Sequence, residues 1–128
     1  MAVRGIGVDL LSVARMEATW QRHGIRLAER ILHPDELAEL PEGSKVGRWL
    51  AKRWAVKEAA SKALGTGFQQ SVKFSDFCYS HDALGKPLLS LFGQAALIAK
   101  QTERHLWHVT VSDEKDQVIA MVVAENGQ

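Results

Sequence analysis

The sequence predicts an α+β domain in which a mostly antiparallel sheet packs against one long helix. Runs rich in β-forming residues occur at 3–11, 72–80, 86–92, 106–112 and 117–125. The longest helical pattern covers 44–64, between the first run and the other four. The second and third runs, and likewise the fourth and fifth, are joined by only a few polar residues, which favours antiparallel hairpins over parallel crossovers.

Length and composition indicate an ordinary globular protein. The chain has 128 residues, so we expect one domain over 1–128 with a single core. Sixteen Lys and Arg against fifteen Asp and Glu leave almost no net charge, which gives no support for nucleic acid as a partner. One cysteine, Cys78, permits no internal disulfide. With neither a transmembrane-length apolar run nor a signal segment, we expect no membrane contact and a cytoplasmic location.

The first strand, "VRGIGVDLL" (3–11), has two different faces. Ile6 and Val8 share one face, whereas Gly5, Gly7 and Asp9 share the other. Two glycines leave the face that carries the carboxylate without side chains. Another backbone or a ligand can therefore approach it closely.

Helices are expected to follow this strand. Ser12 is a good N-cap for a helix that ends at Gly24, and "LAERIL" (27–32) is helical in pattern. Pro34 suits the first position of a further short helix. The helix over 44–64 is rich in alanine and ends at Gly65, and "GQAALIAKQTER" (93–104) predicts the last helix.

The sequence "GTG" (65–67) invites a phosphate-loop interpretation, which we do not favour. These glycines follow a helix C-terminus, where the macrodipole is negative and the free backbone groups are carbonyls. Anion-binding loops usually lead into a helix N-terminus. Gly65 is more simply the helix C-cap.

Glu58 and Lys62 are four residues apart, so they lie on one face of the long helix. Taken alone, they are most simply a surface pair that adds roughly 0.2–0.5 kcal/mol to the helix. Asp9, on its glycine-lined strand face, adds a second carboxylate. Two carboxylates with a nearby lysine would suit Mg²⁺ and a phosphate group.

Positive charge is concentrated in two segments. Residues 44–62 contain one carboxylate, Glu58, against Lys45, Arg48, Lys52, Arg53, Lys57 and Lys62. In the first helical region, Arg15, Arg22 and Arg26 form either a solvated face or a docking surface for an acidic protein. The histidines have no zinc-site spacing, and neither a G-x-S-x-G nor a G-x-x-x-x-G-K-[ST] motif occurs.

Three stretches together resemble a known family. "GIGVDLLSVAR" (5–15), "RWLAKRWAVKEAASKALGTG" (48–67) and "LGKP" (84–87), in this order, resemble the holo-acyl-carrier-protein synthases, the small bacterial 4′-phosphopantetheinyl transferases. The resemblance covers essentially the whole chain. It implies the 4′-phosphopantetheinyl transferase-like fold.

The resemblance also implies an activity. Family members transfer the 4′-phosphopantetheine arm of coenzyme A to a serine of apo acyl carrier protein, and release adenosine 3′,5′-bisphosphate, in fatty acid biosynthesis. The family's Mg²⁺ ligands fall on Asp9 and Glu58, and its catalytic residues on Glu58 and Lys62. The coenzyme A-binding residues implied are Lys45, Arg48, Arg53, Lys62, Gly65, Lys86 and Pro87.

The resemblance implies two macromolecular contacts. Arg15, Arg22 and Arg26 would meet the acidic carrier protein. Family members of this size are usually homotrimers with active sites at subunit boundaries. Whether Asp9 and Glu58 then come from one chain or two stays open, as do the general base, the preference for Mg²⁺ or Mn²⁺, and the choice of carrier.

Two positions depart from the family pattern. Asp113 stands where many relatives have histidine, so no phosphate contact is carried over to it, and Gln117 replaces a common aromatic residue. Two other classes of function remain in competition: a nucleic-acid-binding module that uses the basic helix, and a non-enzymatic scaffold with solvated lysines. A transferase that serves a polyketide or peptide carrier is a third possibility.

Overall fold

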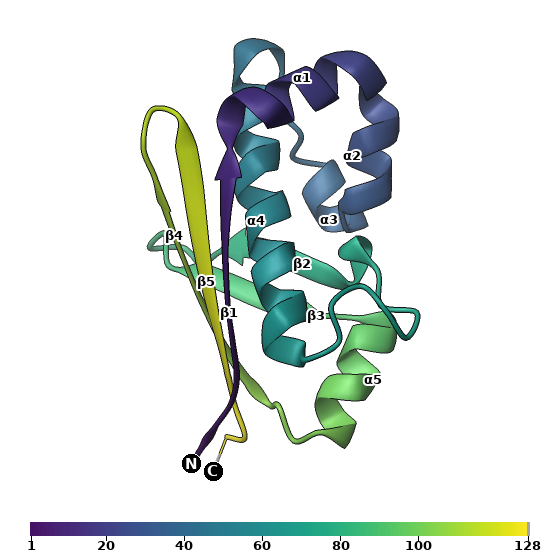
Figure 1. Ribbon diagram of the computed structural model, residues 1–128, viewed down its shortest axis with the longest axis vertical. Coiled ribbons are helices and arrows are strands. Elements are labelled where there is room, and N and C mark those ends of the chain that lie inside the picture. Colours follow the sequence, from purple (N-terminus) through teal and green to yellow (C-terminus); the bar gives the residue numbers. More distant parts are fainter. Residues whose placement is uncertain (128) are drawn as a thin grey trace.

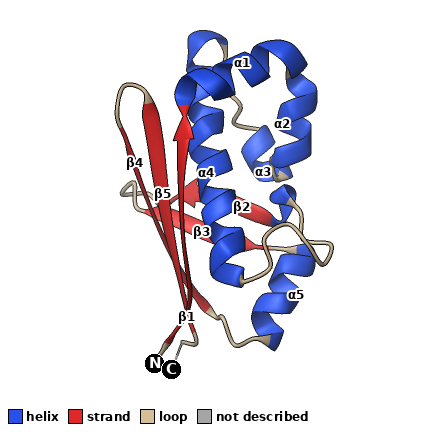
Figure 2. Cartoon of the chain, in the orientation of Figure 1, coloured by secondary structure: helices blue, strands red, loops and turns tan. Residues whose placement is uncertain are grey.

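Helix α4 (Val46–Leu64) lies at the centre of the computed structural model, which describes residues 1–127 (Figure 1). The three longest strands cover one side of α4, and the other helices lie on the opposite side (Figure 2). The remaining helices and strands are β1 (Val3–Ser12), α1 (Val13–His23), α2 (Ile25–Ile31), α3 (Pro34–Leu37), β2 (Phe77–His81), β3 (Pro87–Leu91), α5 (Gly93–Gln101), β4 (Leu106–Asp113) and β5 (Gln117–Glu125). Short 3₁₀ helices cover Gly43–Lys45 and Phe74–Asp76. The predicted α+β class is confirmed.

The strands form two antiparallel sheets. One has the order β1-β5-β4, and the other is the β2-β3 hairpin. The strand predicted over 72–80 is wrong in its first half, because it starts only at Phe77. Residues 74–76 form a 3₁₀ turn, in which the Asp76 carboxylate accepts hydrogen bonds from the backbone N–H groups of Lys73 (3.2 Å) and Ala95 (3.3 Å). This polar anchor competes successfully with the β-forming side chains around it.

The helix boundaries predicted around α1 and α4 are confirmed. Ser12 caps α1, since its Oγ accepts a hydrogen bond from the N–H of Arg15 (3.2 Å). Gly24, with φ +58°, separates α1 from α2. Gly65, with φ +91°, ends α4 in the left-handed conformation that glycine tolerates best.

The glycines of β1 let the strand lie directly on α4. A Cβ at Gly7 would stand 1.9 Å from the carbonyl oxygen of Ala59, and one at Gly5 would stand 1.8 Å from that of Ala63. Of the two possibilities raised by the sequence, backbone or ligand, these glycines therefore accommodate backbone. The close packing places Asp9 on the side of β1 that faces α4.

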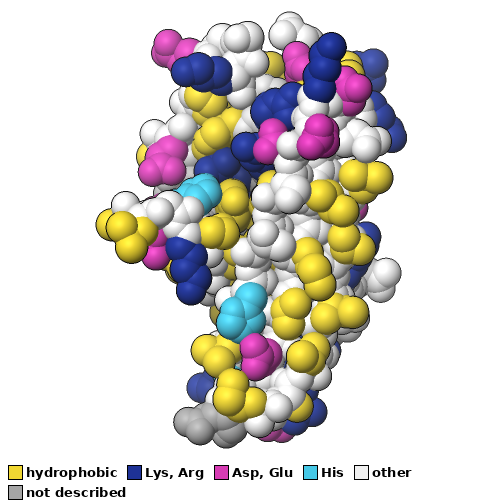
Figure 3. Space-filling view, turned by 90° about the vertical axis from the view of Figure 1, so that its left-hand side faces the viewer, with side chains coloured by type: hydrophobic (Ala, Val, Ile, Leu, Met, Phe, Trp, Pro, Cys, Tyr) yellow, Lys and Arg dark blue, Asp and Glu magenta, His cyan; other side chains and the backbone are white. Residues whose placement is uncertain are grey.

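The core lies between α4 and the inner face of the three-stranded sheet. Val118, Ala120, Val122 and Ala124 of β5 are buried, together with most of α4. The opposite face of this sheet carries apolar side chains that are exposed. Figure 3 shows apolar side chains gathered on that side of the molecule. We call it the outer sheet face; its residues are Ile6, Val8, Leu10, Ile119 and Met121, which are between 41% and 63% exposed.

Strand β1 is an edge strand, and two cations bind its backbone. Lys62 donates a hydrogen bond to the carbonyl of Val8 (2.8 Å), and the Nη2 of Arg104 donates one to the carbonyl of Arg4 (2.9 Å). The Nε of Arg104 also donates to the carbonyl of Ala63 (2.9 Å), which ties the end of α4 to the strand. No helix within residues 1–127 combines the length and apolarity needed to cross a membrane.

Candidate active site

Asp9, Glu58 and Lys62 come together within one chain. The Nζ of Lys62 lies 3.6 Å from Oδ1 of Asp9 while it donates to the neighbouring Val8 carbonyl. The Asp9 side chain is 19% exposed and that of Lys62 is 51% exposed, so the group is open on one side. A single chain therefore supplies all three residues predicted for the reaction centre.

The two carboxylates of this group repel each other. Burial raises the pKa of Glu58, and the negative charge of Asp9 raises it further, against the opposing effect of Lys62. Burial also raises the pKa of Asp9, again opposed by Lys62. One ammonium thus does not fully offset two partly buried carboxylates. Two hard oxygen donors with uncompensated charge fit Mg²⁺, which uses few protein carboxylates and several water molecules.

A second feature is the basic cleft, a cavity of about 810 Å³ between the first half of α4, the β2-β3 hairpin and β4. Its cations are Lys45, Arg48, Lys52 and Arg53, and Pro87 lines it from the hairpin. Four of the predicted coenzyme A residues (Lys45, Arg48, Arg53 and Pro87) therefore lie together. Lys62, Gly65 and Lys86 are not among the described residues that line the cleft.

The cleft and the carboxylate pair are separate within one chain. Neither Asp9 nor Glu58 lines the cleft, and the lining residue of α4 nearest in sequence to Glu58 is Arg53, five residues before it. This spacing is about 7.5 Å along the helix and about 140° around it, so Arg53 and Glu58 point to different sides of α4. A ligand held by the cleft of one chain thus does not automatically reach the carboxylates of that chain.

A buried ionic cluster behind the cleft was not predicted from the sequence. Lys57, which we counted with the basic helix, is fully buried and donates to Glu36 Oε1 (2.6 Å) and to the carbonyls of Phe74 and Phe77. Arg53 has its Nε 3.8 Å from Glu36 Oε2, and its guanidinium lies 3.7 Å from the centre of the Trp49 ring. Since Glu36 and Lys57 are 21 residues apart, no local pattern reveals the pair.

Asp113 holds two of the cleft cations. Its Oδ2 accepts a hydrogen bond from Arg48 (2.8 Å), and its Oδ1 lies 3.6 Å from the Nζ of Lys52. No role was predicted for Asp113 from the sequence. Gln117, the other departure from the family pattern, begins β5 opposite Ser12 and is exposed, so no core packing depends on it.

A further groove, of about 1000 Å³, lies beside α1 and α2. Trp54, Phe68 and Phe74 give it an aromatic wall, and its cationic lining residues are Arg26, Arg30 and Lys73. Of the three arginines predicted to meet a carrier protein, Arg26 lines the groove, whereas Arg15 and Arg22 do not. All three are exposed.

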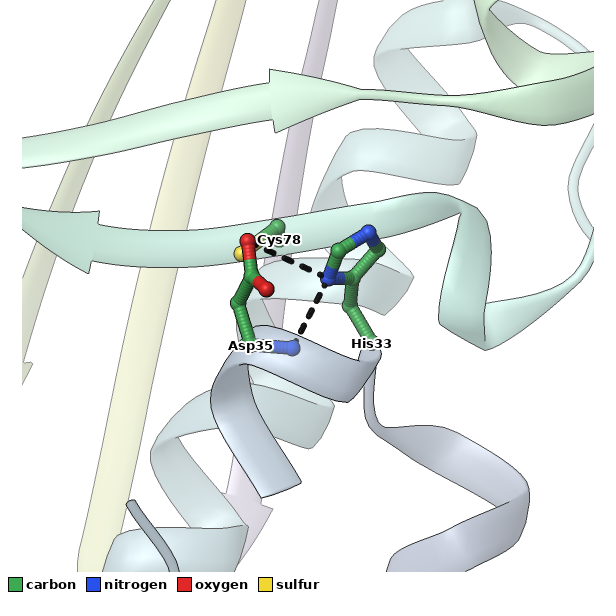
Figure 4. Close-up of side chains that lie close together, drawn as sticks. All are labelled: His33, Asp35 and Cys78. Atoms are coloured by element: carbon green, nitrogen blue, oxygen red, sulfur yellow. Dashed lines mark hydrogen bonds and ion pairs between the residues drawn. The ribbon is translucent and has the colours of Figure 1, made fainter. Parts of the chain in front are cut away.

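His33, Asp35 and Cys78 form a third cluster, at the start of α3 and on β2 (Figure 4). Their possible ligand atoms lie within 4.8 Å of one another, although their sequence spacing does not suggest a metal site. The Nδ1 of His33 already accepts the N–H of Asp35 (3.1 Å) as the helix cap. Burial raises the pKa of the Cys78 thiol to about 11, which opposes the thiolate that a metal ion requires. The cluster is therefore explained by helix capping.

Comparison with known proteins agrees with this geometry. The 4′-phosphopantetheinyl transferase superfamily matches residues 5–122. The holo-[acyl-carrier-protein] synthase of Vibrio cholerae is 49% identical over 121 residues, which are 94% of this chain and 96% of that protein.

Two crystal structures extend the similarity to the fold. Holo-[acyl-carrier-protein] synthase from Neisseria meningitidis has a TM-score of 0.89 at 41% identity, covering 97% of this chain and 99% of that one. The enzyme from Bacillus anthracis, in complex with CoA (3′,5′-ADP), has a TM-score of 0.77 at 32% identity, covering 95% and 96% of the two chains. With its fold, its carboxylate pair and these relatives, the chain belongs to the holo-[acyl-carrier-protein] synthases of the 4′-phosphopantetheinyl transferase superfamily.

Proposed function

We propose that this chain transfers the 4′-phosphopantetheine group of coenzyme A to a serine hydroxyl of apo acyl carrier protein, as a cytoplasmic step of fatty acid biosynthesis. The observation that carries the proposal is the Asp9, Glu58 and Lys62 group, assembled in one chain at the positions that the family motif assigns. In the reaction, the serine oxygen forms a bond to the β-phosphorus of coenzyme A. The bond to adenosine 3′,5′-bisphosphate breaks, and the bisphosphate leaves with the electron pair.

Asp9 and Glu58 would hold Mg²⁺, since their mutual repulsion is what a cation relieves. When bound, the ion supplies positive charge to the pyrophosphate as its negative charge is redistributed. Lys62, with half of its side chain exposed, supplies a mobile positive charge to the leaving phosphate.

Glu58 is the group best suited to accept the serine proton. Its pKa is raised by burial and by Asp9, and a raised pKa makes a carboxylate a stronger base. Asp9 is the weaker base of the two, because the Lys62 ammonium lies 3.6 Å from its Oδ1. This division of roles is part of the proposal.

The basic cleft suits the phosphates of coenzyme A. Within residues 1–127, four cations line it, which suits anionic groups: Lys45, Arg48, Lys52 and Arg53. Lys86 is exposed beside Pro87 on the hairpin that forms one wall, and Gly65 is exposed at the end of α4. The related enzyme from Bacillus anthracis has been crystallised with CoA.

Separation of the cleft from the carboxylates supports a homotrimer whose active sites lie between subunits. If the cleft of one copy adjoins Asp9 and Glu58 of the next, one coenzyme A molecule contacts both. The outer sheet face offers an apolar surface for this contact, since five of its side chains are at least 41% exposed. The occupant of that face is a further copy of this chain.

The carrier protein would dock on α1 and α2. Arg15, Arg22 and Arg26 are exposed there, and the groove beside them combines an aromatic wall with cations. This combination suits an acidic protein that also presents an apolar patch. By contrast, the basic helix is a poor nucleic-acid surface, because Lys57 and Arg53 are buried and Arg48 is paired.

Intact mass spectrometry of apo acyl carrier protein tests the proposal. Incubation with coenzyme A, Mg²⁺ and this protein should add one phosphopantetheine group, whereas Asp9→Ala, Glu58→Ala and added EDTA should abolish the gain. Glu103→Gln, which removes a carboxylate that is 67% exposed, serves as the control and should transfer at the normal rate. Absence of any mass gain with wild type and several carrier proteins would refute the transferase.

A further inference from the structure

The Asp113 carboxylate is placed among the cations of the basic cleft. It contacts Arg48 at 2.8 Å and Lys52 at 3.6 Å, and about a third of each of the three side chains is exposed. Asp113 is the last residue of β4, next to the turn that leads into β5. A negative charge therefore stands at the rim of a cleft whose proposed ligand is an anion.

Arg48 and Lys52 depend on Asp113 to different degrees. Arg48 also donates hydrogen bonds to the carbonyls of Glu114 (2.7 Å) and Lys115 (2.6 Å), so the backbone of the turn fixes it even without the carboxylate. Lys52, by contrast, has Asp113 as its one ion-pair partner among residues 1–127. Loss of the carboxylate would leave Arg48 in place and release Lys52 toward the cleft.

The cleft is consequently less positive than its residue composition suggests. Arg48 and Lys52 lie within 4 Å of Asp113, and Arg53 lies 3.8 Å from Glu36. The fourth cation of the cleft is Lys45, just before α4, and it forms no ion pair within residues 1–127. A phosphate that enters must compete with Asp113 for two of the four cations, whereas Arg53 shares Glu36 with Lys57.

We propose that Asp113 is a specificity-determining residue that lowers the affinity of the cleft for the phosphates of coenzyme A and of its bisphosphate product. The proposal rests on the function proposed above. In this role Asp113 does not contact the phosphate. Its carboxylate pairs with Lys52 and partly neutralises Arg48 until a phosphate replaces the carboxylate as their partner. Ligands with too few phosphate charges are then held poorly, and the product leaves more readily.

Titration calorimetry with coenzyme A and with adenosine 3′,5′-bisphosphate tests the role of Asp113. Asp113→Asn should bind both ligands about three- to tenfold more tightly than wild type at low salt, as expected for removing one charge a few ångströms from an anion in a wet cleft. The difference should shrink at high salt, because exposed charges are screened. Asp113→Ser, which removes the same charge with a smaller side chain, should shift affinity in the same direction.

Glu114→Gln is the matched control, because it removes one exposed negative charge from the same turn at a residue without an ion pair within 1–127. It should change affinity by less than about twofold. The double variant Asp113→Asn/Lys52→Met should lose most of the gain, since Lys52 is the cation that is released.

Three results would overturn the inference: unchanged or weaker binding by Asp113→Asn and Asp113→Ser, an equal gain in Glu114→Gln, or a full gain in the double variant. If wild type binds neither ligand, the coenzyme A function itself fails. This outcome can be told apart from failure of the Asp113 inference, because it is seen with wild type alone.

Discussion

Lys57 and Glu58 are adjacent in the sequence but lie in opposite environments. Successive residues of a helix point about 100° apart, so the first enters the core while the second reaches the partly exposed site. Lys57 is fully buried on Glu36, whereas Glu58 lies near Asp9 and Lys62. One dipeptide thus contributes both to the core of the fold and to the proposed chemistry.

Replacing Glu58 should stabilise the chain and inactivate it. A carboxyl group whose pKa is raised on folding binds its proton more tightly in the folded chain, so its ionisation costs stability as pH rises above its ordinary pKa. At pH 7.5, Glu58→Gln should raise Tm by less than about 4 °C, because Glu58 is partly exposed and screened. The gain should shrink as pH falls to the carboxyl range.

Thermal unfolding at several pH values, with a transfer assay beside it, measures both effects. Glu103→Gln, at an exposed carboxylate, should leave Tm and activity near wild type. A lower Tm for Glu58→Gln at pH 7.5 would contradict the assignment of Glu58 as a destabilised carboxylate.

Replacing Lys57 should strongly destabilise the folded chain. Lys57→Met would leave Glu36 buried without its ammonium partner, at a cost of about 3–5 kcal/mol. The double variant Glu36→Gln/Lys57→Met should cost clearly less than the sum of the single changes. Urea unfolding measures these free energies. If the costs of the two single changes simply add in the double variant, Glu36 and Lys57 are not coupled. As a control, Lys62→Met, at an exposed lysine, should cost under about 1 kcal/mol.

The grouping of Asp9, Glu58 and Lys62 could be predicted from the sequence, because the three residues lie within motifs that the family shares. The environment of Lys57 could not be predicted in this way. Its partner Glu36 lies in another helix, and its other acceptors are the carbonyls of Phe74, before β2, and Phe77, at the start of β2. The contact between Asp113 and Arg48 could not be predicted either, since the two residues are 65 positions apart. Local patterns predict elements and motifs, whereas such long-range charge pairs require the fold.

At the scale of elements, the packing of β1 on α4 sets the position of Asp9. The strand rests on the helix backbone at Gly5 and Gly7, two residues apart along the same face. The sequence predicted that this face was bare but could not tell whether backbone or ligand would approach it. Only the path of α4 decides between them.

Gly7→Ala should therefore destabilise the chain by about 3 kcal/mol or more, because its Cβ would overlap the Ala59 carbonyl and neither backbone can yield easily. Asp9 would move with the strand, so kcat should fall as well. Gly65→Ala is the matched control: Gly65 is in the left-handed conformation with φ +91°, and its Cβ would meet only the Arg104 side chain, at an ordinary 3.5 Å. Urea unfolding should give roughly 1–2 kcal/mol for the control, and a smaller cost for Gly7→Ala than for Gly65→Ala would contradict the close packing.

At the scale of the whole molecule, the outer sheet face should govern association. Met121→Lys places a charge at the centre of this face, at a side chain that is 46% exposed, so the folded single chain should tolerate it. If copies associate through the face, sedimentation should show a shift from trimer to monomer, with loss of transfer. Leu97→Lys, at a side chain on α5 that is 49% exposed, should leave both unchanged; a trimer that survives Met121→Lys would place the contact elsewhere.

The cations along the edge of β1 have a consequence for how copies can meet. An open edge strand offers unpaired backbone groups to a strand from another molecule, and such pairing leads to sheet extension and aggregation. Here Lys62 and Arg104 occupy the carbonyls of Val8 and Arg4, so an incoming strand would find these acceptors already taken. The edge of β1 is thereby a poor site for sheet extension, which is compatible with the proposed contact through the outer sheet face and opposes an open-ended fibre.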